Sequence, residues 1–292
     1  MNMNFKSSRE PSCSLGQPKG GQQAPVIVVG AGPVGLACAI ELARLKVRII
    51  VLEIREGVVA GSRAVGIRER SLQVLDRLGV YREVQRQGMV LRRGWTYAGD
   101  QLIGENVIQE GTAEPYPSVL LLQQDRLETI LIERAGVDGN IDIRWGHTVE
   151  DLQQEGDGMR LSIRVGDATY TTWAPYVIAA DGAHGGVRKK LGIDYQGGRF
   201  DQHWIIADFK IEADIEKGRR LWFDPPYCAG STTILYQLPG DEWRLDYLIP
   251  LDGNPSEEER PDKVCERIDA HLKMMGIAAD WSYVRSSTYA PT

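Results

Sequence analysis

The sequence predicts a mixed α/β (α+β) fold, with a parallel sheet and a second, mostly antiparallel region. Three observations lead to this fold class. Residues 25–29 are a short β-branched run that continues into a glycine-rich turn, a helix and a second apolar strand. Residues 172–180 form another apolar strand, which ends in an Asp-Gly turn. Residues 242–248 alternate polar and apolar side chains, as expected of a strand with one buried face.

Length, composition and charge exclude several classes of protein. The 292 residues allow one large domain or two ordinary ones, and 42% apolar with 25% charged residues is a globular composition. The net charge is −6, whereas nucleic-acid readers usually carry a basic face, so no nucleic-acid partner is expected. Four separated cysteines without a CxxC pair, and only four histidines, argue against a metal site or a disulfide framework. They indicate a reducing compartment, and we expect the cytoplasm.

The N-terminal region shows neither a secretion signal nor a membrane span. Residues 1–24 are rich in Ser, Gly, Gln and Pro, so we expect a disordered tail. The uncharged stretch from Ala24 to Ile40 approaches the ~20 residues that a membrane span requires. Glycines and Pro33 interrupt this stretch, and Glu41 closes it. A strand, a tight turn and a buried helix explain it better.

The run Gly30-Ala-Gly32-Pro33-Val-Gly35 has the GxGxxG spacing of a dinucleotide-binding fingerprint. Gly30 permits a tight turn, Gly32 lets a pyrophosphate approach the backbone, and Gly35 lets a helix pack closely on the strand. The helix expected at 36–44 would present its free N–H groups and its dipole to the phosphate. This turn is the first candidate binding site.

Glu53 ends the second strand, predicted at 47–52, and lies 23 residues after Gly30. A carboxylate about 20 residues after the fingerprint commonly accepts hydrogen bonds from ribose hydroxyls. It would repel a 2′-phosphate, so NADP is disfavoured at this site. The fingerprint and the acid do not separate FAD from NAD, and a plain βαβ unit with a tight turn remains the alternative.

A second candidate turn is Asp181-Gly182, between the strand at 172–180 and the basic start of a helix near Arg188. Asp-Gly alone is usually only a turn. Its place after a buried strand gives it the context of a second ligand-binding turn.

At this point the chain resembles the single-component FAD-dependent aromatic hydroxylases, the flavoprotein monooxygenases of the para-hydroxybenzoate and phenol hydroxylase type. The similarity is closest to the branch that hydroxylates 3-(3-hydroxyphenyl)propionate. Four motifs carry it: GAGPVGL at 30–36 with Glu53, SRAVGI at 62–67, QDRLETIL at 124–131 and DGAHGGVRKKLGI at 181–193. The resemblance covers nearly everything from residue 25 onward. It implies a Rossmann-like FAD-binding domain with an inserted, mostly antiparallel substrate sheet.

The resemblance also implies the cofactor, the co-substrate and the site residues. FAD is expected as cofactor, NAD(P)H as co-substrate and a small aromatic compound as substrate. The implied cofactor-binding residues are Gly30, Gly32, Pro33, Gly35, Glu53, Arg63, Gln124, Asp181 and Gly182. The glycine turn would bind the pyrophosphate of FAD, and Glu53 the adenosine ribose. Arg63 and Gln124 would contact the diphosphate or ribityl region, and Asp181 would lie near the flavin.

Simpler interpretations of these residues stay open. Arg63 could be a surface arginine, and Gln124 could be a polar residue before a helix cap formed by Asp125 with Glu128. Two departures from the family pattern are Gly185, where the family often has Ser, and Ser62, where it often has Pro. No catalytic residue is identified, because the histidines are more readily structural and no Ser/His/Asp order is visible. A phenolic substrate usually needs a deprotonating partner, which the sequence does not name.

The predicted organisation is discontinuous. Residues 25–89 with 123–198 are expected to form the FAD-binding domain, and 90–122 with 199–292 an incomplete substrate domain. Strands at 141–144, 148–152, 160–165 and 169–173 are expected to form a small meander. Residues 261–276 are predicted to be a helix. Eight aromatic residues between 204 and 247 either line a substrate pocket or, as is commoner, pack the sheet.

The family's third fingerprint, Gly-Asp-Ala-Ala-His, does not occur in the sequence. The resemblance therefore implies an N-terminal portion of a hydroxylase, with weak FAD binding and poorly coupled hydroxylation. Two alternatives remain: a non-catalytic flavin-binding remnant or half of a split enzyme, and an NAD-dependent dehydrogenase. The sequence does not give the oligomeric state.

Overall fold

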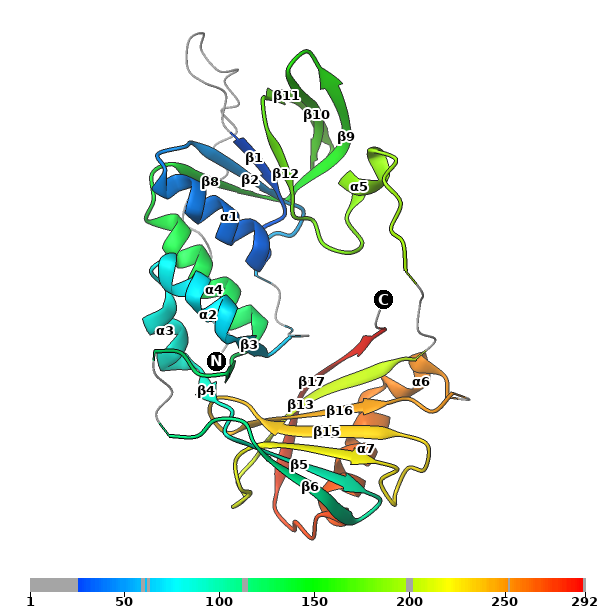
Figure 1. Cartoon of the computed structure of the whole chain (residues 1–292). Coiled ribbons are helices and arrows are strands. Elements are labelled where there is room, and N and C mark those ends of the chain that lie inside the picture. Colours follow the sequence, from blue (N-terminus) through cyan, green and yellow to red (C-terminus); the bar gives the residue numbers. More distant parts are fainter. Residues whose placement is uncertain are drawn as a thin grey trace.

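The computed structural model describes residues 26–58, 61, 64–111, 115–197, 202–251 and 253–290. The predicted tail at 1–24, Ser62 and Arg63 lie outside the described residues. Figure 1 shows a parallel sheet with helices at one end of the molecule and a seven-stranded sheet at the other. Among the described residues, no helix is both long and apolar enough to cross a membrane.

The first sheet has four parallel strands in the order β12-β1-β2-β8. Its strands are β1 (Val26–Val29), β2 (Ile49–Glu53), β8 (Ile141–Trp145) and β12 (Val177–Ala179). Because side chains alternate along a strand, Val28 and Val51 face the helices whereas Ile27 and Leu52 face the opposite side. Burial on both faces explains why β1 and β2 read as apolar runs, whereas β8, at the edge of the sheet, alternates apolar and polar residues.

Helices cover one face of this sheet, and a three-stranded antiparallel sheet covers the other. The helices are α1 (Pro33–Arg44), α2 (Glu69–Arg77), α3 (Tyr81–Gln87) and α4 (Gln124–Gly136). The covering strands are β9 (His147–Glu155), β10 (Gly158–Val165) and β11 (Ala168–Ala174). Helix α1 begins three residues earlier than predicted, since Pro33 is suited to the first helical position.

Two predictions about this region are wrong in detail. The strand expected at 141–144 is part of β8, which pairs in parallel with β2 instead of joining the meander. Its isoleucines pack against the helical side, and Gly146, at φ +71°, redirects the chain before β9. The strand expected at 172–180 is divided between β11, which contains the meander strand expected at 169–173, and β12. Pro175, which has no N–H to donate, separates them, and they pair in different sheets.

The second large sheet has seven strands in the order β17-β13-β16-β15-β14-β5-β6. All neighbours are antiparallel except β14 and β5. The strands are β5 (Arg93–Ala98), β6 (Gln101–Val107), β13 (Trp204–Ile211), β14 (Arg219–Phe223), β15 (Thr232–Gln237), β16 (Glu242–Leu248) and β17 (Trp281–Tyr289). Helix α7 (Pro261–Met274) packs on one face, and α6 (Pro255–Glu258) precedes it. The predictions of α7 and β16 are confirmed.

A small sheet joins the two ends of the molecule. It has the order β3-β7-β4, formed by β3 (Gly66–Arg68), β7 (Val119–Leu121) and β4 (Met89–Val90). Leu121 of β7 packs in one apolar cluster with Leu238, which follows β15 of the seven-stranded sheet. Helix α4 starts shortly after β7, so its first turn lies between the two large sheets. The short helix α5 (Gly186–Lys190) follows the Asp181 turn.

Candidate functional site

The three fingerprint glycines meet three different physical demands. Gly30 has φ +105°, and a Cβ added to it would lie 2.4 Å from the carbonyl oxygen of Ala180. A Cβ on Gly35 would lie 1.9 Å from the carbonyl oxygen of Gly30. A Cβ on Gly32 would meet no described atom within 4 Å. Gly30 and Gly35 are therefore required by the fold, whereas Gly32 leaves space open beside the backbone.

That open space lies at the N-terminus of α1. Gly32 is the N-cap residue and makes no side-chain cap, and Pro33 has no N–H. The first intrahelical bond joins Leu36 N to the Gly32 carbonyl, so the preceding N–H groups of Val34 and Gly35 have no partner inside the helix. Val34 is 67% exposed. An open, uncapped helix N-terminus suits an anionic group such as a pyrophosphate.

Glu53 lies against the same turn and is almost fully buried. Its Oε2 accepts a hydrogen bond from Ala31 N at 2.6 Å, and its Oε1 accepts from Arg55 N at 3.0 Å and Arg55 Nε at 2.9 Å. Burial raises the pKa of Glu53, but the bonds from Arg55 and the backbone outweigh burial and leave the pKa below its ordinary value. The carboxylate is thus ionised and oriented at neutral pH.

The structure links Gln124 to this acid through Arg55, which sequence reasoning missed, and through Glu128, to which it gave a different role. Arg55 Nη1 bonds Glu128 Oε2 at 3.2 Å, and Gln124 Nε2 donates to Glu128 Oε1 at 2.9 Å. Glu128 is only 3% exposed, so it is not the solvent-facing half of a capping box. The helix-cap interpretation is wrong: the N-cap is Gln123, and no side chain caps α4. Arg55 could have been found from the sequence, because it lies two residues after Glu53, the acid that ends β2.

The Asp181 turn lies beside the glycine turn, because β12 pairs with β1. Asp181 Oδ2 accepts a hydrogen bond from Val187 N at 2.9 Å and so holds the start of α5. Gly182 has φ +79°, a conformation that favours glycine. A Cβ on Gly185 would lie 2.2 Å from the Asp181 carboxyl carbon. The departure at Gly185 therefore has a structural reason, since the Asp181 carboxylate occupies the space of a serine side chain.

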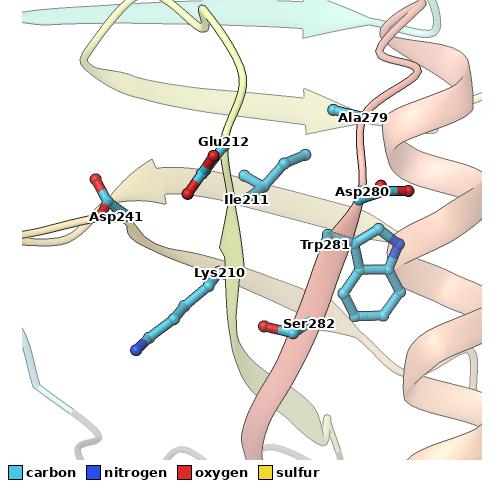
Figure 2. Close-up of a pocket in the computed structure, with 8 residues that line it drawn as sticks. All are labelled: Lys210, Ile211, Glu212, Asp241, Ala279, Asp280, Trp281 and Ser282. Carbon is cyan, nitrogen blue, oxygen red and sulfur yellow. The ribbon is translucent and has the colours of Figure 1, made fainter.

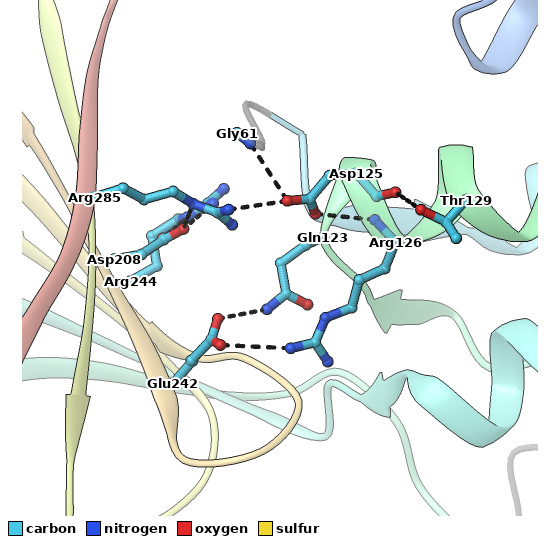
Figure 3. Close-up of polar contacts among 9 residues, drawn as sticks. All are labelled: Gly61, Gln123, Asp125, Arg126, Thr129, Asp208, Glu242, Arg244 and Arg285. Atoms are coloured by element: carbon cyan, nitrogen blue, oxygen red, sulfur yellow. Dashed lines mark hydrogen bonds and ion pairs between the residues drawn. The ribbon is translucent and has the colours of Figure 1, made fainter. Parts of the chain in front are cut away.

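A network of charged residues joins the first turn of α4 to the seven-stranded sheet (Figure 3). Glu242 of β16 bonds Gln123 Nε2 at 2.9 Å and Arg126 Nη2 at 3.5 Å. Arg285 of β17 bonds Asp125 Oδ2 through Nη1 at 2.9 Å. Asp125 Oδ2 also accepts from Gly61 N at 3.3 Å. The turn that carries Gln124 is thereby fixed to strands more than 100 residues later.

The centre of this network is the ion pair of Asp208 and Arg244, whose side chains are 1% and 0% exposed. Arg244 Nε and Nη2 bond the two Asp208 oxygens at 2.6 and 2.9 Å, and Arg285 Nε bonds Asp208 Oδ2 at 2.8 Å. Burial lowers the pKa of Arg244, but Asp208 outweighs burial and raises it, so Arg244 stays charged. No sequence pattern indicated this pair.

Four of the eight aromatic residues between 204 and 247 pack the sheet and do not line a pocket. Phe209, Trp222, Trp243 and Tyr247 are buried against α7. A hollow of about 720 Å³ lies at one end of β13 and β17 and is lined by Lys210, Ile211, Glu212, Asp241, Ala279, Asp280, Trp281 and Ser282 (Figure 2). Its lining comes within two residues of Asp208 along β13, but it includes no residue of the glycine turn or of the Asp181 turn, so we do not assign it to the cofactor.

Comparison with known proteins decides the family. Residues 23–276 match the family described as FAD binding domain. The chain belongs to this family. Para-nitrophenol 4-monooxygenase of Pseudomonas sp. (strain WBC-3) is 29% identical over 63% of this chain and 46% of its own length. The 3-(3-hydroxy-phenyl)propionate/3-hydroxycinnamic acid hydroxylase of Mycolicibacterium smegmatis is 23% identical over 82% of this chain and 42% of its own length. The comparisons thus do not single out the branch that the sequence motifs favoured.

Among solved structures, p-nitrophenol 4-monooxygenase from Pseudomonas putida DLL-E4 is 25% identical with a TM-score of 0.78. The similarity covers 92% of this chain and 68% of that one. The predicted fold class is confirmed: a parallel FAD-binding sheet with separate antiparallel sheets. The chain spans less than half the length of the curated relatives named above.

Proposed function

We propose that this chain binds FAD across the glycine turn and forms the cofactor-binding part of a monooxygenase that hydroxylates a phenolic or aromatic compound with NAD(P)H and O2. Gly30, Gly32, Pro33 and Gly35 would hold the pyrophosphate at the start of α1. Glu53 would accept from the adenosine ribose. Bound flavin supplies the redox and oxygen chemistry, while the protein supplies position and electrostatics.

One observation carries the proposal. A Cβ added to Gly32 would point into open space at an uncapped helix N-terminus, beside the buried carboxylate of Glu53. The residues present fit the adenosine and pyrophosphate half of FAD. Gln124, Asp181 and Gly182 are proposed to lie toward its flavin half, and Arg63 is proposed on the diphosphate. The names of the relatives support a phenolic substrate, and their varied substrates leave its identity open.

The test of binding uses Gly32→Ala. The added methyl group meets no described atom, so the free energy of unfolding should change by no more than about 1 kcal/mol, the cost of a poorer N-cap. The methyl group would block the pyrophosphate, so the Kd for FAD should rise at least about tenfold, as expected for losing one charge-assisted hydrogen bond. Calorimetric titration with FAD, and with NAD as the competing ligand, measures this. Equal FAD affinity in the two proteins contradicts the proposed site.

A second candidate function is flavin binding without turnover by this chain alone, as a remnant or as half of a split enzyme. Its support is that the match with para-nitrophenol 4-monooxygenase covers 46% of the length of that protein. The two functions differ in NAD(P)H oxidation measured with FAD and a panel of phenols. Phenol-dependent oxidation with hydroxylated product supports the hydroxylase. FAD binding without it, or with release of peroxide only, supports the second candidate.

A further inference from the structure

The turn between β14 and β15 carries a cysteine that the cofactor site does not use. Cys228 is partly exposed in this turn and forms no disulfide. Its backbone N–H donates to the Pro225 carbonyl at 2.8 Å, and its carbonyl accepts from Ser231 N at 3.3 Å. The turn is closed further by a bond from Gly230 N to Asp224 Oδ1 at 2.8 Å. The backbone therefore holds Cys228 in a fixed place and leaves the thiol as its remaining functional group.

Arg267 of α7 places a guanidinium group against this thiol. The Arg267 side chain makes a hydrogen bond with Cys228. Burial lowers the pKa of Arg267, but the interactions with Cys228 and Glu258 outweigh burial and raise it, so Arg267 stays charged. Arg267 Nη2 also bonds Glu258 Oε2 at 3.3 Å, and a guanidinium has five N–H donors, so this acid does not occupy all of them. A cation beside a cysteine favours the thiolate, which is the nucleophilic form of the side chain.

A second donor in the same cluster is unused. The Tyr247 hydroxyl is shielded from water and has no hydrogen-bond partner among the described residues, and the residue is only 1% exposed. The Arg267 guanidinium carbon lies 5.2 Å from the centre of the Tyr247 ring. Burial raises the pKa of Tyr247 although Arg267 opposes it, and Cys228 is among the groups that act on this hydroxyl. A buried donor without an acceptor is destabilising, and an oxygen atom attached to the neighbouring sulfur would supply the acceptor.

Tyr227, which precedes Cys228, holds the cluster together. Its hydroxyl makes one hydrogen bond with His271 Nδ1 at 2.9 Å and another with Thr233 Oγ1 at 3.2 Å. Thr233 of β15 lies opposite Tyr247 of β16 in the strand register, so the two tyrosines are held on the same face of the sheet. Because the Tyr227 hydroxyl already has two partners, Tyr247 is the tyrosine with a donor to spare.

The other described cysteines have different surroundings. Cys265 of α7 lies near Asp262 and Asp269, and burial together with these two acids raises the pKa of its thiol. Cys38 lies within α1 and has no charged partner among the described residues. In the part of the chain that the structure describes, Cys228 is thus the cysteine that has a hydrogen bond with a cation. A difference in reactivity among the three thiols follows from these surroundings.

We propose that Cys228 is a site of oxidation by hydrogen peroxide and that Arg267 and Tyr247 bind the resulting sulfenate. The thiolate attacks one oxygen of hydrogen peroxide, so the S–O bond forms and the O–O bond breaks. This gives sulfenic acid and hydroxide, and the hydroxide removes the sulfenic proton to leave sulfenate and water. Sulfur loses two electrons and peroxide gains them. Cys228 and the 17% exposed Arg267 are both accessible to a molecule as small as peroxide.

The first test compares the cysteines within the wild-type protein. The protein is treated with hydrogen peroxide in the presence of dimedone, which traps sulfenic acids. Trypsin places the four cysteines in separate peptides, so mass spectrometry gives a labelling rate for each one. Cys228 should be labelled at least about tenfold faster than Cys38 and Cys265, the effect of one pKa unit on the amount of thiolate. A rate at Cys228 no higher than that at Cys38 or Cys265 overturns the proposal.

The second test removes the cation. Arg267→Gln should slow the labelling of Cys228 about tenfold, and Arg267→Lys, which retains the charge, should recover part of the rate. Arg260→Gln is the matched control, because Arg260 precedes the same helix, is 61% exposed and bonds Asp262 instead of the thiol. It should leave the rate at Cys228 unchanged. Equal rates in Arg267→Gln and the wild type overturn the proposal.

The third test removes the unused donor. Tyr247→Phe deletes a hydroxyl that has no described partner, so the Tm of the reduced protein should not fall. After peroxide is destroyed with catalase, dimedone added at increasing delays measures how long the sulfenate survives. It should decay about fivefold faster in Tyr247→Phe, the effect of one lost hydrogen bond. An unchanged lifetime overturns the role of Tyr247.

These outcomes do not depend on the proposed function. Peroxide is added, no flavin is needed, and the substituted residues lie outside the cofactor site. Loss of FAD binding would therefore leave the three tests intact, and failure of the tests would leave the proposed function intact. Thermal unfolding of each variant by circular dichroism checks that the compared proteins are folded.

Discussion

Replacement of Asp208 by asparagine is the sharpest test of the buried ion pair. The Asp208 and Arg244 side chains are 1% and 0% exposed, and Arg285 adds a third charge-assisted bond to the same carboxylate. Asp208→Asn keeps the shape but removes the carboxylate that accepts two charged bonds from Arg244. Breaking a buried pair in this way costs about 3–5 kcal/mol. That is a large part of a typical total of about 5–15 kcal/mol, and corresponds to a fall in Tm on the order of 10 °C.

Two further variants identify the cause of that loss. Arg285→Gln removes a partner that is 26% exposed and leaves the buried pair intact, so it should cost only about 1 kcal/mol. Asp208→Leu combined with Arg244→Met removes both charges and should be much less destabilising than Asp208→Asn. Urea unfolding followed by circular dichroism and tryptophan fluorescence measures all three. An Asp208→Asn protein within about 1 kcal/mol of wild type, or a double variant as unstable as the single one, refutes the reasoning.

Three other predictions follow from the described contacts. Gly35→Ala should destabilise the protein by at least about 2 kcal/mol in urea unfolding, because its Cβ would lie 1.9 Å from the Gly30 carbonyl oxygen; full stability would show that the helix moves away freely. Glu53→Gln should raise the Kd for FAD about tenfold in fluorescence titration by weakening the hydrogen bonds that the side chain accepts from ribose hydroxyls, and an unchanged Kd would place the ribose elsewhere. Burial lowers the pKa of His271 to about 3, so the unfolded chain binds a proton between about pH 6.5 and 3 that the native protein excludes. Stability should therefore fall with decreasing pH in that window by up to about 1.4 kcal/mol per pH unit, and His271→Phe, compared with wild type at each pH, should remove this slope.

The sequence predicted the elements whose signals are local. The glycine turn, the helix at 261–274 and the alternating strand at 242–248 were all visible as short-range patterns. The partner of β8 was not, because a five-residue strand that alternates apolar and charged residues has the same pattern at the edge of a parallel sheet and in a meander. A local pattern fixes what a segment is and not which segment it pairs with.

The candidate site shows the same division. Gly30, Gly32 and Glu53 follow from spacing, whereas Arg285 and Asp125 meet across 160 residues of sequence. The alternation in β16 suggested a solvent-facing polar side. That side is instead an interface, in which Arg244 is completely buried. An alternation of polar and apolar residues shows which face of a strand is polar. It does not show whether that face contacts water or a charged part of the protein.

The order of strands in the first sheet has a consequence for synthesis on the ribosome. Ala180 packs directly against Gly30 of the glycine turn. Strand β1 cannot complete its pairing until β12 has been synthesised, about 150 residues after β1. Such distant partners slow folding and leave apolar edges exposed in the meantime. Until β12 has emerged, β1 can pair only with β2. Cofactor capture becomes a late event in the life of the nascent chain.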